Sequence, residues 1–522
     1  MCKHTNLTGE LIMRKSFFII KVVFILSLLL PCFVFADDWN AGTGGNPSRN
    51  SLSTERGPLT PTLIWEGGLP AVVALPPVIE DNILAMSRIH NINDVLHGTL
   101  IVAHDLTTGE TLWTADLPVD FPSTDWRNRV SAIRDGRVYA TRSGDNNYSF
   151  MYALDAMTGA IIWRSQDSVS ENSTESPSFA ENGDLIVGSL LNVERINAAN
   201  GTRVWRSNRI SPTSNGNEAV VSGNKLYLWE ASGQGPKVKA FDLTTGAVLY
   251  SSPAISGGLV QQIGLFAGPD GTVYAPRSQG NETTDYLVSL KDNDSSLTEN
   301  WRVPLGYVPF ASFGIGPDGS VYSYSRSHRV VRINPQTGAI EDSSEILVSD
   351  FYQPRMAIDS TGIIYVTNGG FSQGALYSFD PDLTTRWSVE ITNVNIGGPA
   401  IGQNGTMVVC GTGTDVRAYQ GTPVGIEEDG LSPLARIPEL FQNFPNPFNS
   451  ECVIGYTIPS ACRVTVDVYD ILGRKVTSLI DQDQQAGLYQ VTWKGQEAAS
   501  GTYLYKIQAG EFTETKIMML LK

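Results

Sequence analysis

The chain alternates between short apolar runs and polar turns, and its most regular stretch is residues 103–113. This segment, Ala-His-Asp-Leu-Thr-Thr-Gly-Glu-Thr-Leu-Trp, returns as Ala-Leu-Asp-Ala-Met-Thr-Gly-Ala-Ile-Ile-Trp at residues 153–163. The Asp can accept hydrogen bonds from backbone amides two residues on and so open a turn. The Gly supplies the positive φ that a tight turn between strands requires. Each segment therefore predicts a β-hairpin ending on a Trp that one hairpin alone cannot bury.

Weaker copies of this segment follow along the chain. One copy keeps the turn but has Asp342 in place of the aromatic residue, and the copy that ends at Trp387 lacks the Gly. The copy at 417–421 contains only the first residues of the segment. Trp65, in contrast, is the last residue of a copy whose first residues are missing. We predict that the aromatic residues and glycines of the copies are structural anchors: Trp65, Trp113, Trp163, Trp205, Tyr250, Trp301, Trp387, Gly109, Gly159, Gly201, Gly246 and Gly338.

The spacing of the copies predicts a β-propeller, because a period of roughly 40–50 residues with four short strands per unit is typical of propeller blades. A second tight turn, such as Asp135-Gly136 or Asp318-Gly319, lies midway in each unit. The strand that ends at Trp65 can complete the blade begun by residues 401–420, and this closure removes the exposed edges of a linear array. We predict an all-β fold with about eight four-stranded blades over residues 37–421.

The pattern Ala-x-Asp-x-x-Thr-Gly-x-x-x-Trp resembles the repeat of the pyrroloquinoline-quinone-type (PQQ-like) propellers. Two copies match it at every defined position, and the resemblance covers roughly Asp37 to Gly421. It implies that each Trp docks against the next blade, so that the motif is structural. It thus predicts the fold and leaves the chemistry open.

The N-terminal residues 1–36 predict a secretory signal peptide. Basic residues precede the apolar run 22–35, which ends at Ala36, and this run is shorter than the roughly 20 residues of a membrane-spanning helix. A retained membrane anchor is the alternative interpretation, and the true start is Met1 or Met13. Residues 37–60 predict an irregular arm leading onto the propeller, with Trp39 as its anchor.

Residues 439–522 predict a second, smaller domain with six or seven short strands, as in an Ig-like β-sandwich. Residues 422–438 have no strand pattern and predict a linker. The opening Asn-Phe-Pro-Asn-Pro-Phe-Asn, the run Val-Tyr-Asp-Ile-Leu-Gly-Arg-Lys-Val, the run Ser-Gly-Thr-Tyr-Leu-Tyr and the terminal 516–522 resemble the C-terminal sorting domain of type IX secretion substrates. This resemblance implies export to the cell surface or medium, with the secretion machinery as a partner. Cys452 and Cys462 could form a disulfide in this domain.

Composition narrows the classes of partner. The net charge is −16, and cleavage after Ala36 would remove four basic residues and one acidic residue and take it to about −19. An acidic chain repels nucleic acid phosphates and anionic membrane surfaces. Cys410 lies in an apolar run, which predicts a buried thiol.

Several motifs invite a catalytic or metal interpretation, and we commit to no catalytic, cofactor or metal residue. The resemblance to quinoproteins implies PQQ and calcium beside a pair of neighbouring cysteines, and Cys410 has no such neighbour, so we expect neither. The Gly-x-Ser-x-Gly match at 370–374 falls between two predicted strands rather than at a strand–helix turn. His90, His97 and His104 are spaced by seven residues, which does not bring three imidazoles together on β-structure. The segment 291–294 could hold calcium, but a solvated turn is the simpler interpretation.

Binding is better supported than chemistry, because propellers present their loops around a central channel. Exposed aromatic residues beside Arg or Asn suit glycans or peptides, with packing between blades as the alternative. The candidate ligand residues are Trp126, Arg127, Tyr307, Phe310, Phe351 and Tyr352. We predict a secreted or surface-exposed, monomeric binding scaffold. The alternative is a secreted enzyme, either a quinoprotein oxidoreductase or a hydrolase or lyase acting on polysaccharide.

Overall fold

The computed structural model is built of β-strands throughout its described part. It describes residue 39 and residues 41–521 apart from 42–43, 74, 122–124, 145–148, 170–176, 213–217, 257–263, 278–285, 306–312, 348–353, 369, 371, 393, 395–396, 422–438, 441–442, 444–447, 459–460, 485–486, 496–497 and 511. The predicted signal peptide and linker lie outside the described residues. Within the described residues no helix is long and apolar enough to cross a membrane.

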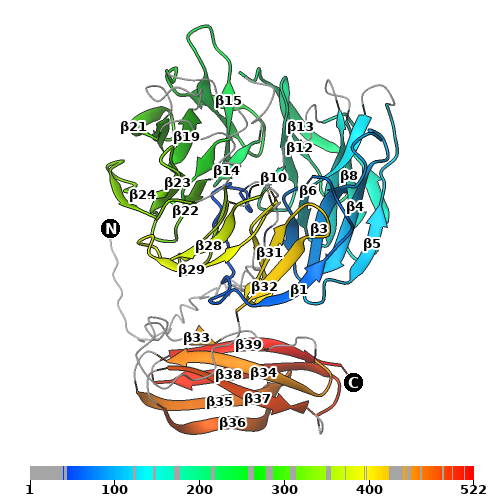
Figure 1. Cartoon of the computed structure of the whole chain (residues 1–522), viewed down its shortest axis with the longest axis vertical. Coiled ribbons are helices and arrows are strands. Elements are labelled where there is room, and N and C mark those ends of the chain that lie inside the picture. The colour runs from blue at the N-terminus through cyan, green and yellow to red at the C-terminus, as the bar shows by residue number, and fades with distance from the viewer. Residues whose placement is uncertain are drawn as a thin grey trace, which may run out of the picture. The chain divides into compact units, whose positions relative to one another are not determined.

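The first part of the chain folds into eight antiparallel sheets of four strands each, which confirms the predicted propeller (Figure 1). Innermost strands of neighbouring sheets lie side by side, for example β2 beside both β6 and β30. Blades 1 to 4, from the centre outward, are β2 (Val78–Glu80), β3 (Ile83–Ile89), β4 (Thr99–Asp105) and β5 (Thr111–Ala115); β6 (Asp125–Arg134), β7 (Arg137–Gly144), β8 (Met151–Asp155) and β9 (Ile161–Arg164); β10 (Ser178–Phe179), β11 (Leu185–Gly188), β12 (Asn192–Ile196) and β13 (Arg203–Asn208); and β14 (Val220–Ser222), β15 (Lys225–Glu230), β16 (Lys237–Asp242) and β17 (Val248–Ser251).

Blades 5 to 7 continue the same order. They are β18 (Phe266–Ala267), β19 (Val273–Arg277), β20 (Tyr286–Asp292) and β21 (Leu297–Pro304); β22 (Phe313–Ile315), β23 (Val321–Tyr324), β24 (Val330–Ile333) and β25 (Ile340–Ser343); and β26 (Arg355–Ile358), β27 (Ile364–Thr367), β28 (Ala375–Phe379) and β29 (Thr385–Glu390).

Blade 8 closes the ring with strands from both ends of the propeller sequence. It consists of β30 (Ala400–Gly402), β31 (Thr406–Cys410), β32 (Val416–Gln420) and, as its outermost strand, β1 (Leu63–Gly67). Trp65 pairs with Ala418 in this sheet, as the two incomplete copies of the repeat predicted. The closure leaves no end blade with an unpaired face.

Burial follows the position of a strand in its blade. All seven residues of β3 are buried, because neighbouring blades cover both faces of the sheet there. In β5, at the rim, only Trp113 is buried and the other residues are exposed or half-buried. The inner strands therefore read as continuous apolar runs, whereas the outer strands carry polar residues around one aromatic anchor.

The N-terminal arm crosses the centre of the ring and bonds to one inner strand after another. Its carbonyl groups accept backbone hydrogen bonds from blades 1, 4, 5, 6 and 7 in chain order, and Ala41 bridges to Ala132 of blade 2. In blade 3 the Ser178 hydroxyl donates to the Pro47 carbonyl at 3.2 Å. The backbone pairs are Ile79 N to Trp39 O, Val221 N to Pro47 O, Ala267 N to Ser48 O, Ile315 N to Asn50 O and Ile358 N to Ser51 O.

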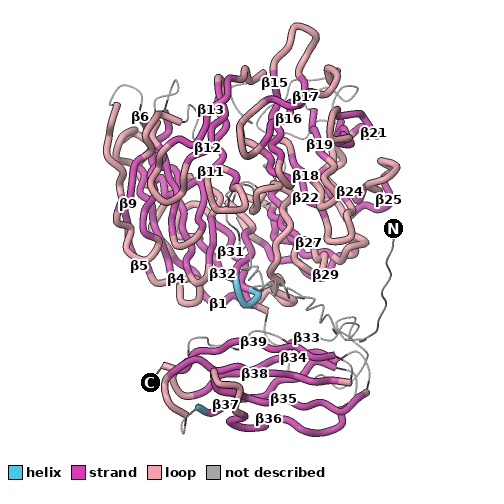
Figure 2. Tube along the Cα trace, turned by 180° about the vertical axis from the view of Figure 1, so that it is seen from behind, coloured by secondary structure: helices cyan, strands magenta, loops and turns pink. Residues whose placement is uncertain are grey.

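The C-terminal part folds into two sheets with a shared core, which confirms the predicted Ig-like sandwich (Figure 2). The sheets are β33 (Glu439–Leu440), β34 (Glu451–Ile458) and β37 (Gly487–Lys494); and β36 (Lys475–Gln484), β35 (Cys462–Asp470), β38 (Gly501–Ala509) and β39 (Phe512–Leu520). Cys452 and Cys462 are both free thiols and lie in different sheets, in β34 and β35. The Cys452 Sγ instead lies 3.9 Å from the Met518 Sδ.

We predict that Trp39→Ala destabilises the propeller by about 3–5 kcal/mol, the usual loss for truncating a buried Trp. Trp39 is 3% exposed and its indole packs against Gly45, where an added Cβ would lie 2.6 Å from the ring. Thermal unfolding of the mature chain measures the change. Thr60→Ala, at an exposed position of the same arm, is the control that should leave the melting temperature nearly unchanged. Equal effects of the two substitutions would contradict an anchoring role for Trp39.

Candidate functional site

The repeat anchors form docks between neighbouring blades. The Trp113 Nε1 of blade 1 donates a 2.8 Å hydrogen bond to the Ala156 carbonyl in the turn of blade 2. The same ring covers Gly159, where an added Cβ would lie 2.6 Å from the Trp113 Cε3. Gly159 also has a φ of 71°, which favours Gly in the turn. The turn therefore requires Gly for its backbone conformation, and the dock requires Gly because a side chain would collide with the ring.

Four further junctions repeat this dock. In each, an indole nitrogen donates to a turn carbonyl of the next blade at 2.7–3.1 Å, and a glycine of that turn lies beneath the ring. The pairs are Trp65 with Gly109, Trp163 with Gly201, Trp205 with Gly246 and Trp301 with Gly338. The pair of Trp65 and Gly109 joins blade 8 to blade 1 and so seals the ring.

The junction of blades 4 and 5 replaces the Trp dock with a polar cluster around Asp292. The Tyr250 hydroxyl, at the Trp position, donates to Asp292 Oδ1 at 2.6 Å, and the Tyr227 hydroxyl donates to Asp292 Oδ2. The Lys225 Nζ lies 2.8 Å from Asp292 and 2.7 Å from Asp294. Burial opposes ionisation of Asp292, but the hydrogen bonds from Lys225 and the two tyrosines outweigh it and hold the pKa of that carboxyl below its usual range.

Lys291, Asn293 and Asp294 are exposed, as expected of a solvated turn, whereas the side chain of Asp292 is only 10% exposed. The Lys225 ammonium lies 2.8 Å from one carboxylate and 2.7 Å from the other, so a cation of the chain itself offsets one of the two negative charges.

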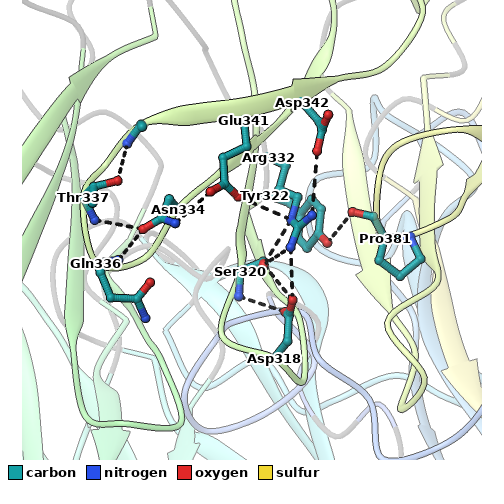
Figure 3. A network of polar contacts seen from close by, with 11 residues as sticks. Asp318, Ser320, Tyr322, Arg332, Asn334, Gln336, Thr337, Glu341, Asp342 and Pro381 are labelled. Atoms are coloured by element: carbon teal, nitrogen blue, oxygen red, sulfur yellow. Dashed lines mark hydrogen bonds and ion pairs between the residues drawn. The ribbon is translucent and has the colours of Figure 1, made fainter.

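The junction of blades 6 and 7 also lacks the indole, and an arginine-centred network lies there (Figure 3). Arg332 faces Asp318 at 3.3 Å and Asp342 at 3.7 Å, and it donates to the Ser320 hydroxyl. The Tyr322 hydroxyl donates a 2.8 Å hydrogen bond to the Pro381 carbonyl of blade 7. Asp342, which has the place of the aromatic anchor, thus takes part in an ion-pair network.

Trp387 of blade 7 does not form the indole hydrogen bond of the docks. Its ring lies 6.0 Å from that of Tyr365 in its own blade, and its buried Nε1 has no hydrogen-bond partner among the described residues. The Gly is absent from the turn of its own copy, and the copy that would receive this Trp is the incomplete one at 417–421.

The histidines and the Gly-x-Ser-x-Gly match make contacts that serve the fold. His104 is buried beside Trp65, and burial lowers its pKa, while its Nδ1 lies 3.1 Å from the Gly109 carbonyl. His97 pairs with Asp116 at 2.7 Å, and His90 is exposed. In the described part of the chain no three metal-ligating side chains come together. Gly370 and Gln373 close the turn between β27 and β28, as the strand pattern predicted.

Cys410 is buried as predicted. Its thiol lies 3.6 Å from the Met86 Sδ, and burial raises its pKa to about 12. A thiol with this pKa is inert at neutral pH.

Most of the predicted ligand residues cannot be placed. Tyr307, Phe310, Phe351 and Tyr352 lie outside the described residues, and so does the side chain of Trp126. Arg127, the remaining one, donates a 2.8 Å hydrogen bond to the Ile92 carbonyl of blade 1. This hydrogen bond joins blade 2 to blade 1, and a ligand role for Arg127 stays a prediction.

The structure adds three charged residues at the ring centre that the sequence did not single out: Arg129, Glu218 and Arg355. Each lies three residues before the residue of its inner strand or bridge that bonds to the arm, namely Ala132, Val221 and Ile358, and β6 has a bulge between Val130 and Ala132. Sequence reasoning missed these residues because they come from blades 2, 4 and 7 and no spacing in the sequence relates them.

The Nε atoms of Arg129 and Arg355 and the Oε2 of Glu218 are buried without a hydrogen bond in the described part of the chain. Burial lowers the pKa of both arginines to about 10, with the neighbouring Arg127 adding to the effect at Arg129 and the Glu218 carboxylate opposing it at Arg355. Both remain cations at neutral pH.

Comparison with known proteins agrees with this architecture. Residues 97–342 match the family model of the outer membrane protein assembly factor BamB, a PQQ-type repeat model, and residues 442–520 match that of a secretion system C-terminal sorting domain. No curated protein sequence matches the chain significantly.

Solved structures similar to this chain include BamB from Moraxella catarrhalis, which is 17% identical, with 60% of this chain and 84% of that chain covered and a TM-score of 0.39. PorZ, an essential surface component of the type IX secretion system of Porphyromonas gingivalis, is 13% identical, with 86% and 71% covered and a TM-score of 0.40. A quinohemoprotein alcohol dehydrogenase from Pseudomonas putida is 11% identical, with 89% and 81% covered and a TM-score of 0.39. All three scores are below 0.5, and the fold rests on the strand pairing of the chain itself.

We predict that Gly159→Ala destabilises the protein by about 1–3 kcal/mol more than Gly136→Ala, because only the former drives a methyl group into a packed ring. Both glycines have a φ near 70°, but an added Cβ at Gly136 meets nothing within 4 Å. Gly136→Ala therefore measures the strain of positive φ alone. Chemical denaturation of the two variants gives the difference, and equal losses would mean that the dock adds nothing to the turn.

We predict that Asp292→Asn lowers the free energy of unfolding at pH 7 by about 3 kcal/mol, as expected when one partner of a buried ion pair is removed. Because its pKa is lowered in the folded state, Asp292 stabilises the fold fully above its usual value near 3.8, and this contribution is lost as the pH falls through the lowered pKa. The difference between wild type and variant should therefore shrink below about pH 3.8.

Asp294→Asn is the matched control for this experiment. Asp294 contacts the same ammonium, but its side chain is 94% exposed, so its loss should change stability by less than about 1 kcal/mol. Unfolding curves recorded between pH 3 and pH 7 compare the two variants. Similar losses for both, or a pH-independent loss for Asp292→Asn, would contradict the ion-pair account.

Proposed function

We propose that this chain, which carries a PQQ-type repeat propeller and a C-terminal sorting domain, acts as a non-catalytic binding scaffold at the cell surface or outside the cell. The sorting domain directs export by type IX secretion to one of these locations, with the secretion machinery as its partner. What the propeller then binds is the open part of the function.

The proposal rests on a difference between the two faces of the ring, which are formed by the two ends of the strands. In an antiparallel blade, successive connections alternate between the ends, so the repeat turns lie on one face and the connections between blades on the other. The face of the repeat turns is occupied by docks from one blade to the next. None of the docks described above involves the described residues of the connections between blades, and loops on a rigid scaffold are the usual place for recognition.

The carboxylates of the repeat support a structural role for the motif. Asp155 accepts hydrogen bonds from the Met157 and Thr158 amides, and the Thr158 hydroxyl and these amides lower the pKa of the carboxyl. Asp242 makes the same contacts with Thr244 and Thr245. These groups are engaged in their own turns and so are poorly placed as general bases.

We predict that the mature chain, Asp37 to Lys522, shows a rise in melting temperature with one class of glycan or peptide and none with PQQ and calcium. A ligand that binds only the folded state raises the melting temperature by mass action. Thermal-shift titration against a panel of neutral and acidic glycans, peptides, and PQQ with calcium makes this test.

Two outcomes would overturn the proposed function. A shift with PQQ and calcium, together with reduction of a dye by an alcohol or sugar, would make the protein a quinoprotein. Release of shorter products from a bound glycan would make it a hydrolase or lyase.

A further inference from the structure

The turn between β35 and β36 of the sorting domain carries two apolar residues at its corners. The Gly473 amide donates to the Asp470 carbonyl at 2.9 Å, so Ile471 and Leu472 occupy the two central positions of the turn. Polar residues, Gly and Pro are the usual occupants of these positions. The two side chains are 70% and 73% exposed, the highest values among the large apolar side chains in the described part of the chain. We call Ile471 and Leu472 the apolar tip.

The backbone beneath the apolar tip is held firmly. The Asp470 Oδ1 accepts hydrogen bonds from the Leu472 and Arg474 amides at 3.0 Å each, and its Oδ2 accepts one from the Arg474 Nε at 2.7 Å. Gly473 has a φ of 76°, which suits the end of such a turn. Because the turn is already ordered, a partner that covers the tip loses little affinity to the cost of ordering it.

The propeller shows what usually happens to an apolar residue that follows the Asp of a turn. Leu106 and Leu243 have this place in the repeat turns and are 2% and 5% exposed. The indole of Trp65 or Trp205, from the preceding blade, donates to the carbonyl of the same residue. Such a residue is therefore covered by a neighbouring unit in the propeller, whereas the described part of the chain provides no cover for the apolar tip.

The surface beside the apolar tip is also apolar. Val476, in a β-bulge of β36, is 43% exposed. Tyr469, Leu504 and Ile517 are aligned across β35, β38 and β39, and their neighbours along these strands belong to the core, so the row lies on the outer face of the sheet. Single exposed apolar residues are ordinary on a protein surface, but a group of them marks an interaction site.

The basic residues next to the apolar tip are paired within the domain. The Arg474 Nε lies 2.7 Å from Asp470, and the Lys475 Nζ lies 2.6 Å from Asp467. Their charges are thus offset locally, and the tip presents an apolar surface rather than a positive one. This favours an apolar pocket on a protein over an acidic protein surface or anionic lipid headgroups.

We propose that the apolar tip inserts into an apolar pocket on a protein of the type IX secretion machinery. This inference rests on the export step of the proposed function and identifies the surface through which the sorting domain meets its partner. The domain that carries the tip is the one that directs export, so the machinery is the partner that has to recognise it. Removing two aliphatic side chains from water provides the driving force for the contact.

The test uses the full chain, expressed in a bacterium that has type IX secretion. An antibody against the propeller measures the protein outside the cell and in the periplasm, whether or not the sorting domain is removed. Ile471→Ser combined with Leu472→Ser should lower the exported amount roughly tenfold or more, as expected for the loss of interface anchors. Ile471→Val combined with Leu472→Met keeps the tip apolar and should preserve export.

Two matched controls remove exposed apolar side chains elsewhere. Met157→Ser changes a residue that is 66% exposed in a turn of the propeller, and Val453→Ser changes an exposed residue on the other sheet of the sorting domain. Both should be exported like the wild type. The purified double Ser variant should melt at the wild-type temperature, because exposed side chains contribute little to stability.

Crosslinking in cells keeps the proposal testable if the double Ser variant folds poorly. A photoreactive residue at position 472 should form an adduct with a component of the secretion machinery. The same residue at position 453 should form none.

Normal export of the double Ser variant, an equal loss of export in the two controls, or no adduct with the machinery from position 472 would overturn the proposal. Binding of the wild type to vesicles of phosphatidylethanolamine and phosphatidylglycerol that the Ser variant loses would replace the protein pocket with a membrane. A wild-type dimer that the Ser variant loses would replace it with a second copy of the chain. Retention of the wild type in the periplasm would instead overturn the export step, and the ligand titration of the propeller tests the rest of the proposed function independently of the tip.

Discussion

The packing of one Trp over the turn glycine of the next blade is the interaction on which the ring depends. A four-stranded blade cannot bury its own outermost aromatic residue, as Trp113 shows by lying against Gly159 rather than within its own sheet. Each such aromatic residue is therefore buried by the next blade, and the array is complete only when the last blade packs against the first. β1 provides that closure, since Trp65 belongs to blade 8 and covers Gly109 of blade 1. The same requirement explains why the glycine recurs, because any side chain would displace the ring above it.

The arm adds a second, independent connection at the ring axis. The docks join neighbours at the rim, whereas the arm reaches seven of the blades in turn among the described residues. Its contacts are mostly backbone hydrogen bonds, so they place few demands on the side chains of the inner strands. Trp39 and Gly45 fix the start of the arm by packing. The arm thus ties the inner strands of these blades together at the axis.

Charge at the junction of blades 4 and 5 takes the place of a dock. Lys225 of blade 4 pairs with Asp292 and Asp294 of blade 5, and two tyrosine hydroxyls of blade 4 donate to Asp292. The cluster is therefore a structural contact between the two blades.

The sequence by itself determined the local units and their number. The Asp, Gly and Trp of the repeat specify a turn and an anchor within eleven residues, and the incomplete copies at Trp65 and at 417–421 predicted the closure, because these features depend on neighbours along the chain. The sorting domain was predictable for the same reason, from four separate motifs. Tertiary structure alone decided which side chains meet. The pairing of Asp292 with Lys225 joins residues of different blades, whose distance is set by the packing of the blades in the ring rather than by spacing in the sequence.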